Sequence, residues 1–299
     1  MVDLQTSSSL RVVYFGSAGD LSTIPLNALI KSSHTIVAVV VYEPELEQVR
    51  LNVVDAEQQN NVQSIAFRNN INIIRLSGDL SGIKDSAFDC LQQSSLDLLV
   101  TSCFSQKIPA NIIALACMGA INIHPSLLPE YRGPDPIFWQ IRDAVAYSGV
   151  TLHLMSDQFD AGNIVAQRKV KLDGSIDLGK LSNLLAHLAK ELLIETLGHI
   201  ELSIEQAWEQ DEALSSYHSR PDIGSFELST EWDAKRLFYF VRATSGRTLY
   251  YPISIKGKAL KLVSVIACHE IKQEKLTATD KYSYFACKSG FIAAEVLTD

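Results

Sequence analysis

Short apolar runs rich in Val and Ile alternate with helical stretches along the first two thirds of the chain, and this alternation constrains the fold most strongly. The runs are continuously apolar, which is typical of strands covered on both faces. The intervals between them are long enough for crossover helices, so the sequence predicts an α/β, Rossmann-like, mostly parallel sheet with helices on both faces. We expect strands at residues 11–15, 35–42, 71–76, 96–101 and 119–124, and helices at 23–31, 109–118 and 177–200.

A different pattern begins after residue 200. Residues 201–219 are polar and mixed, and we interpret them as a linker. We expect an α/β catalytic domain over 1–205 and a small β-barrel-like, OB-like substrate domain over 206–299. The second domain is predicted from a helical pattern and short alternating runs broken by Gly or Asp, at 229–243, 248–255, 259–267 and 282–286.

The composition argues against several classes of protein. No apolar run approaches the roughly 20 residues that a membrane helix needs, and residues 1–10 lack the features of a signal peptide, so we expect a cytoplasmic protein with no membrane partner. The five cysteines are scattered, without a C-x-x-C pair, which indicates neither a disulfide framework nor a zinc site. Acids and bases balance at twelve each beyond residue 205, so the whole net charge of −8 lies before it.

Asn122 and His124 lie two residues apart in a predicted strand, so both side chains project from the same face. Pro125 and Pro129 then force the chain out of the sheet, which places the pair near a strand's carboxyl end, where open α/β sheets bind ligands. The pair is also compatible with a buried structural histidine and a turn-forming asparagine.

A second polar segment follows the strand pattern that begins at Gly149, in a loop that carries Asp157 and Asp160. A carboxylate beside an imidazole raises its basicity and fixes its tautomer, which suits a reaction that accepts and returns a proton. An asparagine adds a neutral donor for a developing oxyanion. Such a set fits acyl transfer to an amine without a covalent enzyme intermediate, although Asp160 and Gly162 alone are also compatible with a simple turn.

The segment Ile121–Gly133, INIHPSLLPEYRG, followed by Asp160-Ala-Gly162, resembles the 10-formyltetrahydrofolate-dependent formyltransferases. The likeness extends from about Arg11 to Ile200. The resemblance implies that Asn122, His124 and Asp160 are catalytic, that 10-formyltetrahydrofolate is the formyl donor and that no metal is needed. It also implies a folate slot formed mainly by backbone groups of two loops, at Phe104, Ser105, Gln106, Ile108, Met155, Ser156 and Phe159. Gly16, Ser17, Arg132 and Gly133 would face the amine acceptor.

The sequence leaves the acceptor open. Residues 232–243 resemble the helix that opens the second domain in enzymes that formylate initiator methionyl-tRNA and in several sugar formyltransferases, and initiator methionyl-tRNA is the leading acceptor. Seven bases without an intervening acid support it: Lys235, Arg236, Arg242, Arg247, Lys256, Lys258 and Lys261. The acidic segment 43–50 and the residues 244–247 depart from the methionyl-tRNA pattern. His153 is closer to the glycinamide ribonucleotide enzymes, and it also suits a structural strand position.

Alternative functions therefore remain. An amino-sugar nucleotide or an amino-acid or peptide amine is the next acceptor after methionyl-tRNA. A formyltetrahydrofolate hydrolase, in which water replaces the amine, ranks lower. The turn Gly16–Gly19 also suggests a non-enzymatic nucleotide-binding domain, but it lacks the G-x-G-x-x-G spacing.

Overall fold

The computed structural model describes residues 9–43, 61–78, 88, 91, 95–255, 257–269 and 283–297. By its internal contacts the chain forms two compact units, which we describe separately. The first contains residues 1–133, 149–170 and 182–217, and the second contains 134–148, 171–181 and 218–299. The predicted division into domains at residues 205 and 206 stays a prediction, which limited proteolysis would test.

A seven-stranded sheet has the order β3-β2-β1-β4-β5-β6-β7. The pairs among β1 to β5 are parallel and β6 runs antiparallel to β5, which confirms the mostly parallel α/β fold. The order reverses at β1, because the chain proceeds to β2 on one side and later to β4 on the other. The strands are β1 (Arg11–Phe15), β2 (Thr35–Tyr42), β3 (Asn72–Leu76), β4 (Leu98–Ser102), β5 (Ala120–His124), β6 (Tyr147–Leu154) and β7 (Ile164–Lys171).

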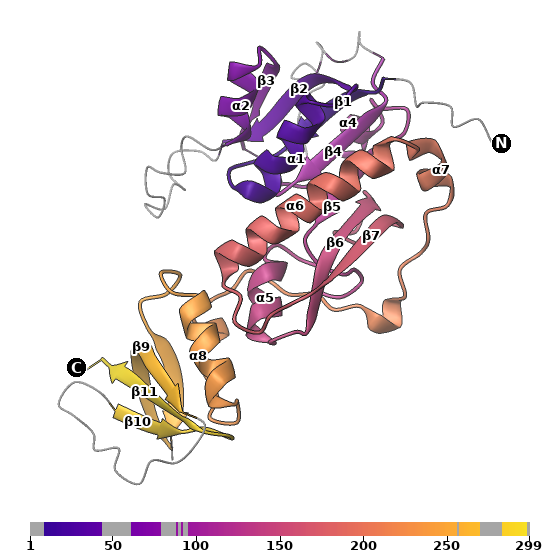
Figure 1. Ribbon diagram of the computed structural model, residues 1–299. Coiled ribbons are helices and arrows are strands. Elements are labelled where there is room, and N and C mark those ends of the chain that lie inside the picture. The colour runs from indigo at the N-terminus through magenta and orange to yellow at the C-terminus, as the bar shows by residue number, and fades with distance from the viewer. Residues whose placement is uncertain are drawn as a thin grey trace. The chain divides into compact units, whose positions relative to one another are not determined.

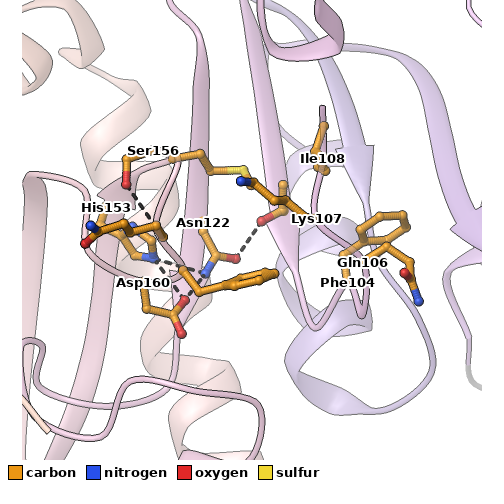
Figure 2. Close-up of a pocket in the computed structure, with 12 residues that line it drawn as sticks. Phe104, Gln106, Lys107, Ile108, Asn122, His153, Ser156 and Asp160 are labelled. Carbon is orange, nitrogen blue, oxygen red and sulfur yellow. Dashed lines mark hydrogen bonds and ion pairs between the residues drawn. The ribbon is translucent and has the colours of Figure 1, made fainter. Parts of the chain in front are cut away.

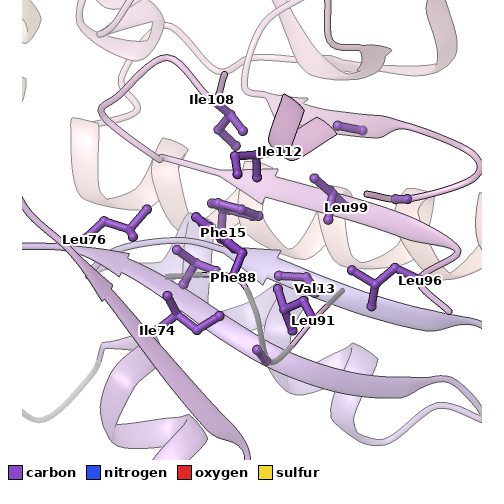
Figure 3. Close-up of a cluster of buried hydrophobic side chains, with 14 residues drawn as sticks. Val13, Phe15, Ile74, Leu76, Phe88, Leu91, Leu96, Leu99, Ile108 and Ile112 are labelled. Atoms are coloured by element: carbon purple, nitrogen blue, oxygen red, sulfur yellow. The ribbon is translucent and has the colours of Figure 1, made fainter. Parts of the chain in front are cut away.

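Helices cover both faces of this sheet (Figure 1). On one face, Asn183 of α6 donates to Asp20 of α1, which places these two helices side by side. The opposite face carries a core of fourteen buried residues that includes Val13, Phe15 and Leu99 from the strands and Ile112 from α4 (Figure 3). The helices of the first unit are α1 (Asp20–Ile30), α2 (Val62–Arg68), α4 (Ala110–Ile113), most of α6 (Leu178–Leu197) and α7 (Ile200–Glu205), whereas α5 (Pro136–Arg142) belongs to the second unit.

Helix α4 is shorter than the 109–118 that the sequence predicts. The backbone N–H of Cys117 donates to Leu96 and that of Met118 donates to Asp97, at 3.0 and 2.9 Å. These residues therefore extend the ladder beside β4 instead of continuing the helix. A backbone N–H can satisfy only one of the two arrangements.

The segment that the sequence predicts as a linker packs against the first unit in the structure. Residues 201–219 contain the end of α7 and a 3-10 turn at Glu212–Leu214. Trp208 pairs with Ile164 and Tyr217 pairs with Arg132, so the segment up to Tyr217 packs within the first unit.

The second unit contains an antiparallel sheet of four described strands, in the order β10-β11-β9-β8. Register shifts between β11 and β9 bend the sheet, which gives the curled half-barrel that the β-barrel-like prediction describes. A cluster of buried hydrophobic residues around Leu237, Phe240 and Tyr251 forms the core of this unit. The elements are a 3-10 turn (Ile223–Phe226), α8 (Ala234–Ala243), β8 (Tyr251–Ile255), β9 (Lys258–His269), β10 (Ser283–Ala286) and β11 (Phe291–Val296). Throughout the described ranges, no helix is both long and apolar enough to cross a membrane.

Candidate active site

A row of polar side chains crosses three neighbouring strands of the large sheet. Thr101 on β4, Asn122 on β5 and His153 on β6 occupy adjacent register positions. Two residues earlier on the same face, Leu99 and Ala120 belong to the buried core. The face therefore changes from apolar to polar near the carboxyl ends of β4 and β5, the edge at which α/β sheets bind ligands.

Asn122 is oriented by its neighbours on both sides. The Thr101 hydroxyl donates to Asn122 Oδ1 at 2.5 Å, so the Asn122 amino group points the other way. There Nδ2 lies 3.0 Å from His153 Nε2 and 3.4 Å from Asp160 Oδ1. His153 Nδ1 lies 2.9 Å from the carbonyl oxygen of Leu154, which can only accept. His153 therefore carries its proton on Nδ1, and its Nε2 accepts from Asn122.

His124 is buried, with 4% of its surface exposed. Its Nε2 lies 2.8 Å from the carbonyl oxygen of Tyr131, which fixes a proton on Nε2. Its Nδ1 lies 3.5 Å from Asp160 Oδ1. Burial lowers the pKa of His124, and the Asp160 carboxylate partly opposes this. The geometry thus presents a neutral imidazole whose Nδ1 can take a proton next to a carboxylate.

Asp160 stays ionised at neutral pH. Burial raises the pKa of its carboxyl, but the positive charge of protonated His124, the contact with His153 and the Gly133 backbone N–H outweigh burial and bring the pKa down to about 2. The Gly133 N–H donates to Asp160 Oδ2 at 2.9 Å. Asp160 has a φ of 55°, in the left-handed region. Two residues on, a Cβ at Gly162 would lie 1.8 Å from the Leu154 carbonyl oxygen, so only glycine fits that turn.

A cavity of about 70 Å³ opens beside this group. In Figure 2, Phe104 and Ile108 lie on the right, and Asn122, His153 and Asp160 lie on the left. Of the seven residues that the resemblance assigns to the folate, six line the cavity, whereas Ser105 is exposed and lies outside the lining set. The lining residues are Thr101, Phe104, Gln106, Lys107, Ile108, Asn122, His153, Met155, Ser156, Gln158, Phe159 and Asp160.

Sequence reasoning missed Thr101 as a site residue and left the role of His153 open. Both side chains contact Asn122 directly, and these contacts follow from strand register, which sequence alone does not give. Lys107 Nζ donates to the Asp157 carbonyl oxygen at 2.9 Å and so ties the two loops of the cavity together.

The residues predicted to face the acceptor have varied surroundings. In the loop after β1, Gly16 is buried and Ser17 is exposed. Arg132 is 8% exposed, and its guanidinium forms two hydrogen bonds with Glu212 and two with Gln210. The backbone of Gly133 contacts Asp160. An acceptor contact at these positions stays a prediction.

Residues 10–197 match the protein family described as formyl transferase, and the chain belongs to that family. This confirms the resemblance given by Ile121–Gly133 and Asp160–Gly162, and it makes the chain an enzyme that transfers formyl groups.

Individual relatives align with most of the chain. The chain is 29% identical to a methionyl-tRNA formyltransferase of Lachnospira eligens, and the alignment covers 95% of this chain and 90% of that protein. It is 31% identical to a methionyl-tRNA formyltransferase of Staphylococcus aureus over 81% of this chain and 75% of that protein.

Solved structures share the fold. An N-formyltransferase from Helicobacter canadensis, in complex with folinic acid and dTDP-3-aminofucose, has a TM-score of 0.68 at 18% identity, covering 96% of this chain and all of that one. HypX from Aquifex aeolicus, in complex with tetrahydrofolic acid, has a TM-score of 0.60 at 18% identity, covering 96% of this chain and 44% of that one.

Proposed function

We propose that the chain transfers the formyl group of 10-formyltetrahydrofolate to a primary amine, with Asn122, His124 and Asp160 as its catalytic residues. The observation that carries the proposal is the convergence of two groups on one oxygen. Asn122 Nδ2 and His124 Nδ1 lie 3.4 and 3.5 Å from Asp160 Oδ1, beside the cavity. An oxyanion donor, a proton acceptor and a carboxylate that sets its charge are thus held together.

The reaction follows from these positions. The acceptor nitrogen attacks the formyl carbon, and the carbonyl oxygen becomes an oxyanion that Asn122 Nδ2 stabilises. His124 Nδ1 takes the proton released by the amine, directly or through water, and the resulting imidazolium pairs with Asp160. The same proton then passes to N10 of the folate as the bond from N10 to the formyl carbon breaks. The products are the N-formyl amine and tetrahydrofolate.

The charge of the Asp160 and His124 pair matters at the tetrahedral stage. An ionised Asp160 alone would repel an oxyanion held by Asn122. Once His124 is protonated, the pair is neutral overall, so the oxyanion forms next to a dipole and not next to a net negative charge. The 3.4 Å contact from Asn122 Nδ2 to Asp160 is long for a hydrogen bond, so exchanging it for an oxyanion costs little.

The folate is proposed to occupy the cavity between the two loops. Phe104 and Phe159 supply apolar surface on the two loops, and Phe159 is 59% exposed. An aromatic side chain that is this exposed beside a cavity is suited to stack on a flat ring.

The leading acceptor is initiator methionyl-tRNA. The support is the length over which the chain is similar to methionyl-tRNA formyltransferases, together with exposed bases of the second unit. Lys235, Arg242, Lys258 and Lys261 are exposed there, and such groups can track a phosphate backbone. Arg236 stacks on Trp232 and Arg247 forms an ion pair with Asp135, so these two arginines serve the fold. Lys256 and residues 44–50 of the acidic segment lie outside the described residues.

An amino-sugar nucleotide is the second candidate acceptor. The Helicobacter canadensis enzyme aligns over its whole length, and its structure contains dTDP-3-aminofucose. The experiment is a spectrophotometric assay of tetrahydrofolate release from 10-formyltetrahydrofolate with methionyl initiator tRNA, with a panel of amino-sugar nucleotides and amino acids, and with no acceptor. Turnover that needs the tRNA supports the leading acceptor, and turnover with a sugar nucleotide alone replaces it. Equal turnover with no acceptor would identify a hydrolase instead.

A further inference from the structure

The segment 208–217 contacts two separate loops of the candidate site. Trp208 exchanges backbone hydrogen bonds with Ile164, at 2.8 and 3.0 Å, just beyond the loop that carries Asp160. Ser216 accepts from the backbone N–H of Tyr131 through its hydroxyl, at 2.8 Å, and from that of Arg132 through its carbonyl, at 2.9 Å. The segment therefore spans from the Asp160 loop to the loop 129–133.

Gln210 makes four hydrogen bonds between these loops. Its Nε2 donates to the carbonyl oxygens of Asp160 and Gly162, at 2.8 Å each. Its Oε1 accepts from Nε and Nη2 of Arg132, at 3.1 and 2.8 Å. Arginine only donates and carbonyl oxygens only accept, so the orientation of the amide is fixed and all of its hydrogen-bonding capacity is used.

Both loops joined by Gln210 bear on the proposed proton relay, whose second member, His124, lies at the end of β5. One loop carries Asp160, whose backbone is in the left-handed region. The other provides the Tyr131 carbonyl that fixes the His124 tautomer and the Gly133 N–H that binds the Asp160 carboxylate. The separation of 3.5 Å between Asp160 Oδ1 and His124 Nδ1 depends on how these loops are held together.

We propose that Gln210 is a positioning residue that sets the distance between Asp160 and His124 by clamping the Asp160 backbone to Arg132. The inference rests on the proposed function, in which this pair moves the proton. The Gln210 amide is fully engaged by Arg132 and by the carbonyl oxygens of Asp160 and Gly162, so it acts through Asp160 and not on the substrate. Glu212 is the weaker partner of Arg132, because its side chain is 67% exposed and Arg132 keeps Gln210 without it.

The central test is Gln210→Met, which keeps the length of the side chain, adds no charge and removes all four hydrogen bonds. The matched control is Gln206→Met, because Gln206 is exposed and caps α7 only through its backbone. We expect kcat to fall about 10- to 100-fold in Gln210→Met, as displacements of about 1 Å in catalytic groups do. The KM for 10-formyltetrahydrofolate should stay within about twofold, and the control should match the wild type.

A second readout does not depend on turnover. The Asp160 carboxylate raises the pKa of His124, so its displacement in Gln210→Met should move the His124 imidazole titration, followed by NMR, to lower pH. If Gln210→Met fails to fold by circular dichroism, Gln210→Glu replaces it in the kinetic test, because it keeps an oxygen for Arg132 and loses both donors to the carbonyls. A drop in kcat alone is again expected, whereas Glu212→Gln should keep most of the activity.

The proposal is overturned if a folded Gln210 variant keeps kcat within about threefold of the wild type, or if Gln210→Met leaves the His124 titration unchanged. Equal losses in kcat and in folate affinity would indicate a general structural role and would also overturn it. A wild-type protein that turns over no acceptor would refute the proposed function instead. The His124 titration would still decide whether Gln210 positions Asp160.

Discussion

Replacing Asp160 with Asn removes a negative charge from the site while keeping the shape of the side chain. In the wild type the carboxylate faces His124 Nδ1 at 3.5 Å and accepts from the Gly133 N–H at 2.9 Å. The amide can still accept from Gly133, so the fold should persist. The imidazolium that forms when His124 takes the proton of the amine loses its counter-charge.

The structure gives the scale of this loss. At 3.5 Å and an effective dielectric constant of about 20, a unit charge pair is worth roughly 5 kcal/mol. Proton transfer by a positioned group typically contributes about 100- to 10,000-fold, and 5 kcal/mol lies within the range that such factors span at about 1.4 kcal/mol per tenfold. We therefore expect kcat of Asp160→Asn to fall about 100- to 10,000-fold.

The measurement is kcat at saturating folate donor and amine, together with folate affinity by titration calorimetry. Folate affinity should stay close to that of the wild type. Asp157→Asn is the matched control: Asp157 is an exposed carboxylate of the same loop whose backbone, and not its side chain, contacts Lys107. Its kcat should equal that of the wild type. An Asp160→Asn enzyme with kcat within about threefold of the control would refute the role given to the charge.

Other variants test the remaining parts of the site. Asn122→Ala should lower kcat about 100- to 1,000-fold with folate binding intact, as removal of an oxyanion donor does; unchanged kcat would remove Asn122 from the mechanism. His153→Gln should keep most of kcat, because an amide oxygen can still accept from Asn122, whereas His153→Leu should lose about tenfold or more; equal rates in the two would show that the 3.0 Å contact is not needed. Phe159→Ala should raise the KM for the folate donor several-fold with a smaller change in kcat, and the opposite pattern would place Phe159 outside the folate slot. Asp160 should also make the free energy of unfolding depend on pH in the acid range. Its pKa is about 2 in the folded chain against an ordinary value of 3.8, which corresponds to about 2 kcal/mol. This stability is present above about pH 4 and is lost as the pH falls through about 2. Denaturant titrations of wild type and Asp160→Asn should converge over that range, and parallel curves would contradict the assignment.

Continuous apolar runs were enough to predict β1 to β5 and the class of fold. The run at 35–42 matches β2, because a strand buried on both faces carries its signal in every residue. The pattern missed β11 (Phe291–Val296), because this run is short and contains alanine. It also extended α4 too far, because the sequence does not show that Cys117 and Met118 donate to β4 residues. Local periodicity does not report pairings between distant segments.

The sequence likewise predicted only part of the candidate site. Asn122, His124 and Asp160 are the set that the family resemblance implied, and Asn122 Nδ2 and His124 Nδ1 lie 3.4 and 3.5 Å from Asp160 Oδ1. The supporting contacts come from residues far along the chain. Gln210 reaches Asp160 from a stretch that is polar and without periodicity, so the sequence indicated a linker where the structure has a clamp. A polar side chain that binds only backbone groups and one arginine gives no periodic signal to detect.

The most direct test of the central claim is a single-turnover measurement with 10-formyltetrahydrofolate and methionyl initiator tRNA, following both tetrahydrofolate and the formylated amine. The account predicts that the two products appear together at one rate and that neither appears without an amine. In each of the variants Asn122→Ala and Asp160→Asn, the formation of both products should be slowed by the same factor, while folate still binds. Release of tetrahydrofolate at the same rate without an amine, or wild-type rates in both variants, would contradict it.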